Sequence, residues 1–167
     1  RTLLRNLSHY YPEGEYWLYA PKLQKKDFST FLFEGKSFRL VKPKINNPFW
    51  RESGVRRRFL KDGIHLYHGL SHQIPKGIKN SQMKSIVTIH DLIFKRLPST
   101  YSAVDRRLYD HKFGHAIRQS DKIIAISDQT KIDILEYYPS VAEEKIEVIY
   151  QACDPLYYEQ WDTAKAD

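Results

Sequence analysis

The sequence contains a single cysteine, Cys153, among its 167 residues, so no disulfide can form within the chain. This composition fits a reducing compartment. No apolar run is long enough to cross a bilayer, and no secretory signal peptide is recognisable. The sequence begins with Arg1 instead of methionine, which favours a piece of a longer protein.

Several motifs that would point to a particular chemistry are missing as well. Neither Gly-x-Gly-x-x-Gly nor a Walker A loop is present, and the Gly-x-Ser-x-Gly elbow of serine hydrolases is absent. No Asp-x-Asp pair supports a divalent-cation site for a nucleotide sugar, and no Cys/His pairing supports zinc. There is no internal repeat and no low-complexity segment.

Positive charge is more plentiful. Lys and Arg number 27 against 20 for Asp and Glu, which gives a net charge of +7. This surplus favours an anionic partner, such as a phosphorylated ligand, an anionic membrane face or a nucleic acid. The basic residues are spread along the chain, which disfavours nucleic acid. We interpret the run Arg56–Arg58 as the solvated face of a helix, with a phosphate or membrane-surface patch as the alternative.

Hydrophobic periodicity predicts strands alternating with helices. The expected strands lie at 15–21, 37–42, 64–69, 85–89, 121–127 and 144–151. The expected helices lie around 3–7 and at 48–61, 101–119 and 128–138, and residues 69–83 are expected to form a loop. The helix at 101–119 is predicted to place Leu108, Tyr109, Phe113, Ala116 and Ile117 on one face. The alternation, with two uniformly apolar strands, predicts an α/β fold with a mostly parallel sheet flanked by helices.

Ligands of such sheets bind outside the carboxyl ends of the strands. Three polar groups follow predicted strands there: "HGLSH" after 64–67, His90 and Asp91 after 85–89, and Ser127 after 121–126. From the residues alone, His90 could equally cap the strand by bonding a loop carbonyl or take part in catalysis. For Asp91 the residues favour a structural role in the loop. Ser127 is interpreted as the N-cap of the helix 128–138, a role that is compatible with binding an anion.

Three histidines near "HGLSH" raise the question of a metal site. His65 and His68 are three positions apart, and this odd spacing places them on opposite faces of a strand. A metal site that includes His72 is therefore less favoured than a loop role for these side chains.

The segments "LYHGLSHQIPKGI", "KSIVTIHDLIFKRLPSTY" and "SDKIIAISDQTKIDILEYYPSVAEEKIEVIYQACDPLYYE", in this order and spacing, resemble the N-terminal half of a retaining family 4 (group 1) glycosyltransferase of the GT-B fold. The likeness extends from about Tyr16 to Tyr158. It implies a Rossmann-like domain that mainly binds the acceptor. Residues 1–153 are then expected to form this acceptor-side domain, and 154–167 the start of the interdomain linker. The donor-binding C-terminal domain and the family's first strand are expected to lie outside this chain.

The resemblance also implies roles for residues. His90 matches the family histidine that reaches toward the donor sugar near the reacting carbon, and Asp91 is its neighbour that organises the loop; both are assigned to the catalytic set. The expected substrate-binding residues are His68, Gly69, Ser71 and His72 on the acceptor side and Ser127 at the start of a helix. The family often has glycine where this chain has Ala152, and because alanine resists positive φ, the turn there is expected to differ.

The implied function is transfer of a sugar from a nucleotide-sugar donor to a glycan or lipid-linked acceptor with retention, in surface polysaccharide or glycoconjugate synthesis. A hexose is expected, with mannosyl and glucosyl transfer both open, and no metal or other cofactor. The protein's own C-terminal domain is the expected partner, and this piece alone is expected to be inactive. A cytoplasmic location is expected, with contact at the inner membrane face left open. The alternative is a non-catalytic module that binds sugars or phosphates on a Rossmann-like scaffold.

Overall fold

The computed structural model describes residues 2–20, 38–42, 55–80 and 82–152. The chain divides into two compact units. The first unit comprises Arg1–Asn47 and Ala152–Asp167, and the second comprises Pro48–Gln151. The predicted linker at 154–167 and the start of the predicted helix at 48–54 lie outside the described residues.

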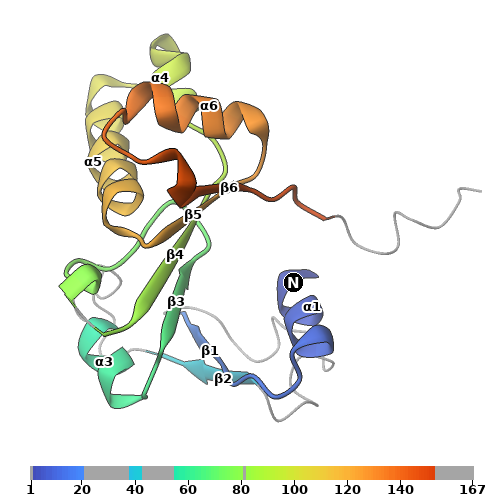
Figure 1. The fold of residues 1–167 in the computed structure, drawn as a ribbon. Helices are drawn as coiled ribbons and strands as arrows, with labels where there is room; N and C mark the ends of the chain where they lie inside the picture. Colours follow the sequence, from blue (N-terminus) through green and yellow to red (C-terminus); the bar gives the residue numbers. More distant parts are fainter. Residues whose placement is uncertain (1, 21–37, 43–54, 81, 153–167) are drawn as a thin grey trace, which may run out of the picture. The chain divides into compact units, whose positions relative to one another are not determined.

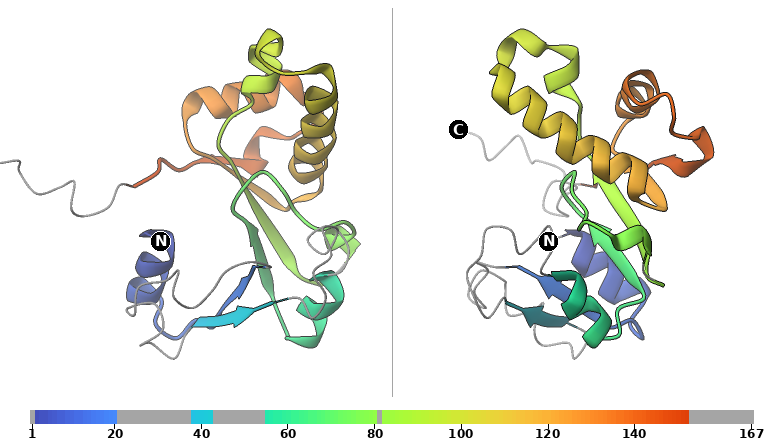
Figure 2. Two further views of the ribbon diagram at one scale, coloured as in Figure 1. Left: turned by 180° about the vertical axis from the view of Figure 1, so that it is seen from behind. Right: turned by 90° about the vertical axis from the view of Figure 1, so that its left-hand side faces the viewer.

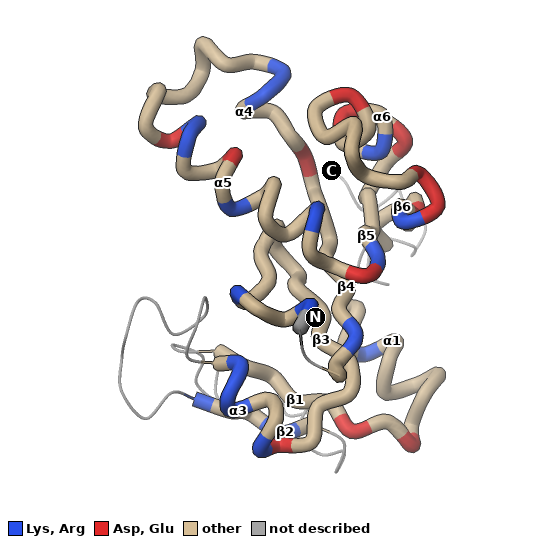
Figure 3. The backbone as a smooth tube through the Cα atoms, turned by 60° about the vertical axis from the view of Figure 1, so that its left-hand side comes forward, with Lys and Arg blue, Asp and Glu red and all other residues tan. Residues whose placement is uncertain are grey.

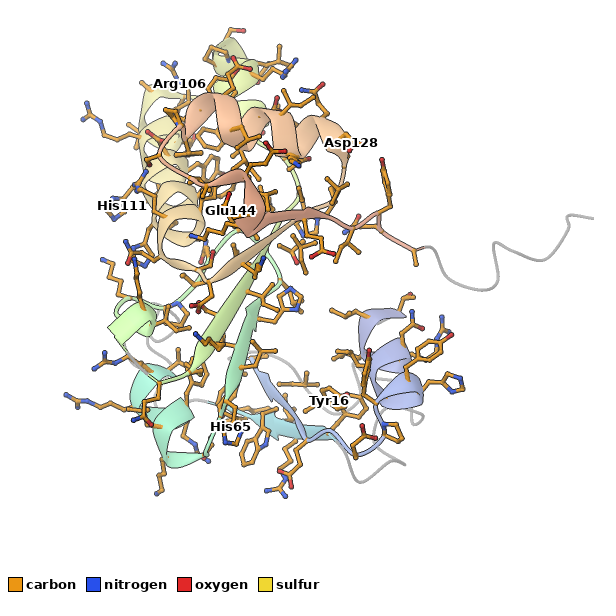
Figure 4. All side chains as sticks on the ribbon, in the orientation of Figure 1. Tyr16, His65, Arg106, His111, Asp128 and Glu144 are labelled. Carbon is orange, nitrogen blue, oxygen red and sulfur yellow. The ribbon has the colours of Figure 1, made fainter. Side chains whose placement is uncertain are left out.

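The first unit contains one described helix and two described strands. The helix is α1 (Thr2–Tyr10), and the strands β1 (Tyr16–Tyr19) and β2 (Phe38–Val41) pair in parallel. Tyr16, labelled in Figure 4, has its hydroxyl 3.1 Å from the carbonyl oxygen of Leu7 and 2.9 Å from that of Tyr11. This side chain therefore ties the start of β1 to the end of α1. The strands predicted at 15–21 and 37–42 are confirmed.

The second unit is built on a parallel four-stranded sheet in the order β3-β4-β5-β6 (Figure 1). The strands are β3 (Leu66–Gly69), β4 (Lys84–Ile89), β5 (Lys122–Ala125) and β6 (Ile146–Val148). The α-helices are α3 (Val55–Lys61), α4 (Ile93–Arg96), α5 (Ala103–Gln119) and α6 (Asp128–Tyr137). Short 3₁₀ helices occupy Ile78–Asn80, Pro98–Thr100 and Glu143–Lys145.

The connections between the strands are those that a parallel sheet requires. Each strand pairs in parallel with the next one along the chain, so each connection must return to the same end of the sheet. α5 provides that return between β4 and β5, and α6 provides it between β5 and β6. The predicted α/β fold with parallel strands flanked by helices, the Rossmann-like arrangement, is confirmed.

The core of the second unit lies where the central strands meet the helices. Val87 and Ile89 of β4 and Ile123 of β5 have no exposed surface, and neither does Ile117 of α5. The continuous apolar run through β5 predicts cover on both faces. Ile124, which alternates with the buried positions, is only half-buried, so the cover on its face is incomplete.

The start of α5 departs from the face that the sequence predicts. Phe113, Ala116 and Ile117 are buried as expected, whereas Leu108 is 46% exposed. Figure 2 shows that the C-terminal half of α5 lies against the strands and its first turns lie away from them. The apolar face that the sequence predicts for α5 therefore extends beyond the part of the helix that packs on the sheet.

The basic run falls on α3, where Figure 3 shows blue stretches alternating with tan. Arg56 donates from Nη1 to the carbonyl oxygen of Gly77 at 3.1 Å, and Arg58 donates from Nε to Asp62 at 2.7 Å. Arg57 between them is exposed. These contacts favour the interpretation of Arg56–Arg58 as a helix face, in which two of the arginines also bind neighbouring residues. Across the described ranges, no helix combines the length and apolar character needed to cross a membrane.

Candidate active site

Three strands of the second unit end at one edge because they are parallel and in register. Gly69 at the end of β3 pairs with Val87 of β4, and Ile89 at the end of β4 pairs with Ala125 of β5. His72 and His90, which follow β3 and β4 and were selected from the sequence, contact each other and groups from neighbouring segments there. We call this group the strand-end site: His72, His90, Thr130 and Gln151, with the carbonyl of Leu70.

His90 follows the central strand β4 and has both ring nitrogens engaged. Its Nε2 lies 2.9 Å from the carbonyl oxygen of Leu70, and its Nδ1 lies 3.1 Å from Nε2 of Gln151. A carbonyl oxygen can only accept, so the ring proton resides on Nε2, and Nδ1 accepts from the Gln151 amide. His90 is therefore arranged as a neutral imidazole whose proton transfers would each require a contact to break.

The backbone of His90 is held from both sides. Its N–H donates to Nδ1 of His72 at 3.4 Å, and its carbonyl oxygen accepts from the hydroxyl of Thr130 at 3.0 Å. Thr130 is buried and lies in the first turn of α6. The backbone at the end of β4 is thus fixed by side chains from a loop and a helix, in addition to the strand pairing.

His72 occupies an unusual backbone position. Its φ is +56°, and within the described residues it is the only residue other than glycine with positive φ. The ring stacks on Phe113 with centroids 4.2 Å apart and planes 4° apart. The backbone N–H of His72 donates to the carbonyl oxygen of Thr88 at 3.1 Å. Burial lowers the pKa of His72 to about 4, with His90 adding to the effect and Asp91 opposing it. A neutral ring is what allows Nδ1 to accept from His90.

His68 and Gly69 serve the packing between β3, β4 and the following loop. Nε2 of His68 lies 2.8 Å from the hydroxyl of Thr88, and burial lowers the pKa of His68. A Cβ at Gly69 would lie 2.2 Å from the carbonyl oxygen of Gln73. Only glycine allows the loop to pass that closely over the strand end.

Asp91 and Ser71 sit beside the strand-end site. Oδ1 of Asp91 accepts from the N–H of Ile93 at 3.1 Å, the Asx-type contact that opens the turn into α4. This matches the loop role that the residue type suggests. Ser71 is exposed in the loop after β3.

Ser127 begins α6 and is connected to His90 through Thr130. Its Oγ accepts from the N–H of Thr130 at 3.1 Å, so the predicted N-cap is confirmed. The two hydroxyl oxygens lie 3.0 Å apart. Because the proton of Thr130 goes to the carbonyl of His90, Ser127 donates to Thr130. The cap of α6 and the backbone of His90 therefore belong to one hydrogen-bonded chain.

The histidines of the "HGLSH" region do not come together as metal ligands. His65, labelled in Figure 4, precedes β3 and is exposed, whereas the ring of His68 faces Thr88. In the part of the chain that the structure describes, no three His, Cys, Asp or Glu side chains are placed to hold a metal ion.

Two residues of the strand-end site, Thr130 and Gln151, were not among the sequence predictions. Thr130 lies three residues after the N-cap Ser127, a spacing that suggests a capping contact. Phe113 was predicted as a core residue of its helix, and its stacking partner could not be inferred. Gln151 carries no recognisable pattern, because its position depends on where the chain runs after β6.

The fold and the strand-end site define an α/β protein with a Rossmann-like sheet and a polar site at the ends of its strands. Residues 2–155 match the family model described as Glycosyltransferase Family 4. The chain therefore belongs to glycosyltransferase family 4, and its function is of the glycosyltransferase type. No curated protein matches the sequence.

Proposed function

We propose that the protein transfers a hexose, mannosyl or glucosyl, from a nucleotide-sugar donor to a glycan or lipid-linked acceptor with retention of anomeric configuration. Residues 1–153 act as the acceptor-side half of a GT-B enzyme, which operates with its C-terminal domain. The process served is surface polysaccharide or glycoconjugate synthesis, in the cytoplasm or at the inner face of the membrane. Family membership supports the reaction class, and the net charge of +7 favours anionic substrates and an anionic surface.

The observation that carries the proposal is the way His90 is held at the end of β4. In the transfer, the bond between the sugar C1 and the nucleotide phosphate breaks, and the acceptor oxygen bonds to C1. The acceptor's proton leaves with the departing phosphate. Positive charge develops on the sugar ring, and preorganised dipoles stabilise it without reorganising during the reaction. We assign this role to His90 because its ring orientation and its backbone are fixed in advance by protein contacts.

The role of a neutral, hydrogen-bonded His90 differs from that of a general base. Nε2 carries the ring proton and Nδ1 accepts from Gln151, so proton abstraction by Nδ1 would require the Gln151 contact to be given up. Orientation of the donor sugar is the role that this arrangement favours. No metal is needed for it.

The test uses the intact protein with a panel of nucleotide sugars and acceptors of the glycan and lipid-linked kinds. The configuration of the product at C1 is read by NMR. His90→Ala is expected to lower turnover by about 10²-fold or more while the thermal unfolding midpoint stays close to wild type. His111→Ala, which removes an exposed histidine of α5 (Figure 4), is the matched control and is expected to behave as wild type.

Two results would contradict the proposal. Wild-type turnover in His90→Ala would remove the role given to this histidine. An intact protein that binds sugar phosphates but transfers no sugar from any donor would favour the non-catalytic binding module instead.

A further inference from the structure

Gln151 faces Nδ1 of His90 from the segment that follows β6. Its amide nitrogen lies 3.1 Å from Nδ1, on the opposite side of the ring from the carbonyl of Leu70. The Leu70 contact places the ring proton on Nε2, so Nδ1 presents a lone pair and requires a donor. The two contacts together set both the protonation pattern and the orientation of the ring.

The segment that carries Gln151 is itself fixed. Ile149 donates from its N–H to the carbonyl of Ala125 at 2.9 Å, so the chain continues alongside β5 after β6 ends. The hydroxyl of Tyr150 donates to Oδ2 of Asp128 at the start of α6, where Figure 4 labels Asp128. Although Gln151 is exposed, its backbone is therefore held next to the strand-end site.

We propose that Gln151 is a positioning residue for the transfer reaction, holding the His90 ring in its Nε2-protonated, neutral form and in its working orientation. The inference rests on the proposed function and adds to it a residue that acts through its contact with His90. Without the amide, the ring keeps a single hydrogen bond, to Leu70. One hydrogen bond does not prevent rotation about χ2, so the orientation of the His90 ring is no longer fixed.

The experiment measures turnover and the ring's protonation separately, in the intact protein. Gln151→Leu keeps the approximate size and removes the donor. It is expected to lower kcat about threefold to tenfold, the effect of one lost hydrogen bond, with a smaller change in KM. Gln151→Glu offers Nδ1 only acceptors. It is expected to move the ¹⁵N imidazole resonances of His90 toward a form protonated on Nδ1, because a carboxylate can only accept from that nitrogen.

Gln119→Leu is the matched control, since Gln119 ends α5 and belongs to no part of the strand-end site. It is expected to keep wild-type kcat and the wild-type His90 resonances. A double variant then tests whether Gln151 acts through His90. In the His90→Ala background, Gln151→Leu is expected to cause no further loss, because the ring that it positions is gone.

The outcomes distinguish a failure of the role given to Gln151 from a failure of the role given to His90. If His90→Ala abolishes turnover but Gln151→Leu leaves kcat and the His90 resonances unchanged, the Gln151 inference alone is overturned. The same holds if Gln151→Leu costs as much with His90 absent as with it present. If His90→Ala retains wild-type turnover, the role of His90 falls, and the role of Gln151 falls with it.

Discussion

Replacing Gly69 with alanine is expected to destabilise the second unit and to disturb the strand-end site at the same time. The added Cβ would lie 2.2 Å from the carbonyl oxygen of Gln73, whereas ordinary contacts of this kind begin at 3.4 Å. The backbone of the loop must therefore move by about 1 Å. Ile74 and Pro75, which follow Gln73, are buried, so the loop has little freedom to retreat. Overpacking of this kind costs about 1–3 kcal/mol, and we expect the upper part of that range.

The disturbance reaches His90 because the same loop carries His72. A displaced His72 loses its contact with the N–H of His90, which is already long at 3.4 Å. Turnover of Gly69→Ala is therefore expected to fall even under conditions where the protein remains fully folded. Urea denaturation followed by circular dichroism measures the stability, and initial rates at low denaturant measure the activity.

Gly114→Ala provides the matched control. A Cβ there would meet the guanidinium group of Arg118 at 2.9 Å, the flexible end of a side chain, and Tyr138 at 3.1 Å. Alanine also favours the helix interior by about 0.5–1 kcal/mol. The net change is expected to stay within about 1 kcal/mol. If Gly69→Ala proved as stable as Gly114→Ala, the steric argument for the loop would be wrong.

Two further predictions concern pH and capping. The pKa of His72 in the folded protein, about 4, lies below its ordinary value of 6.5, so this ring stabilises the fold above pH 6.5 and the contribution is lost as pH falls toward 4. The full pKa shift would be worth about 3 kcal/mol of unfolding free energy, and partial exposure of the ring reduces the expected loss to roughly 1–2 kcal/mol. Urea titrations of wild type and His72→Gln at pH 7 and pH 4.5 measure this loss. Equal changes in unfolding free energy with pH in the two proteins would refute the prediction. Ser127→Ala removes the N-cap of α6 and is expected to cost about 1 kcal/mol by the same assay, with Ser102→Ala, the cap of α5, as a comparison that should leave turnover unchanged. A Ser127→Ala protein with wild-type turnover would show that the hydroxyl chain through Thr130 does not matter to His90.

The order of strands and helices followed from local patterns because each element is short and strongly biased. The run that ends at Ile89 is apolar and β-branched, and the helix after Ser127 begins with a cap and an acid. The exposure of Leu108, in contrast, did not follow from local patterns. Helical spacing specifies which residues share a face, but how far the sheet extends beneath that face depends on tertiary structure.

The candidate site was predictable in its place and less so in its contacts. The carboxyl-end rule placed His90, His72 and Ser127 at one edge, because any parallel sheet gathers its strand ends there. The positive φ of His72 and its stacking on Phe113 leave no trace in the sequence, since residues other than glycine adopt that backbone region only uncommonly. The contact with Gln151 depends on the path of the chain after β6.

The four contacts that hold His90 bring together segments that are distant in the sequence. They span 18 residues to His72, 20 to Leu70, 40 to Thr130 and 61 to Gln151. Such contacts form late, since each must first close a long loop. During refolding, turnover should therefore return after helical circular dichroism has recovered. Enzyme activity would then report that the whole sheet has assembled, because no partly folded chain could hold this histidine in place.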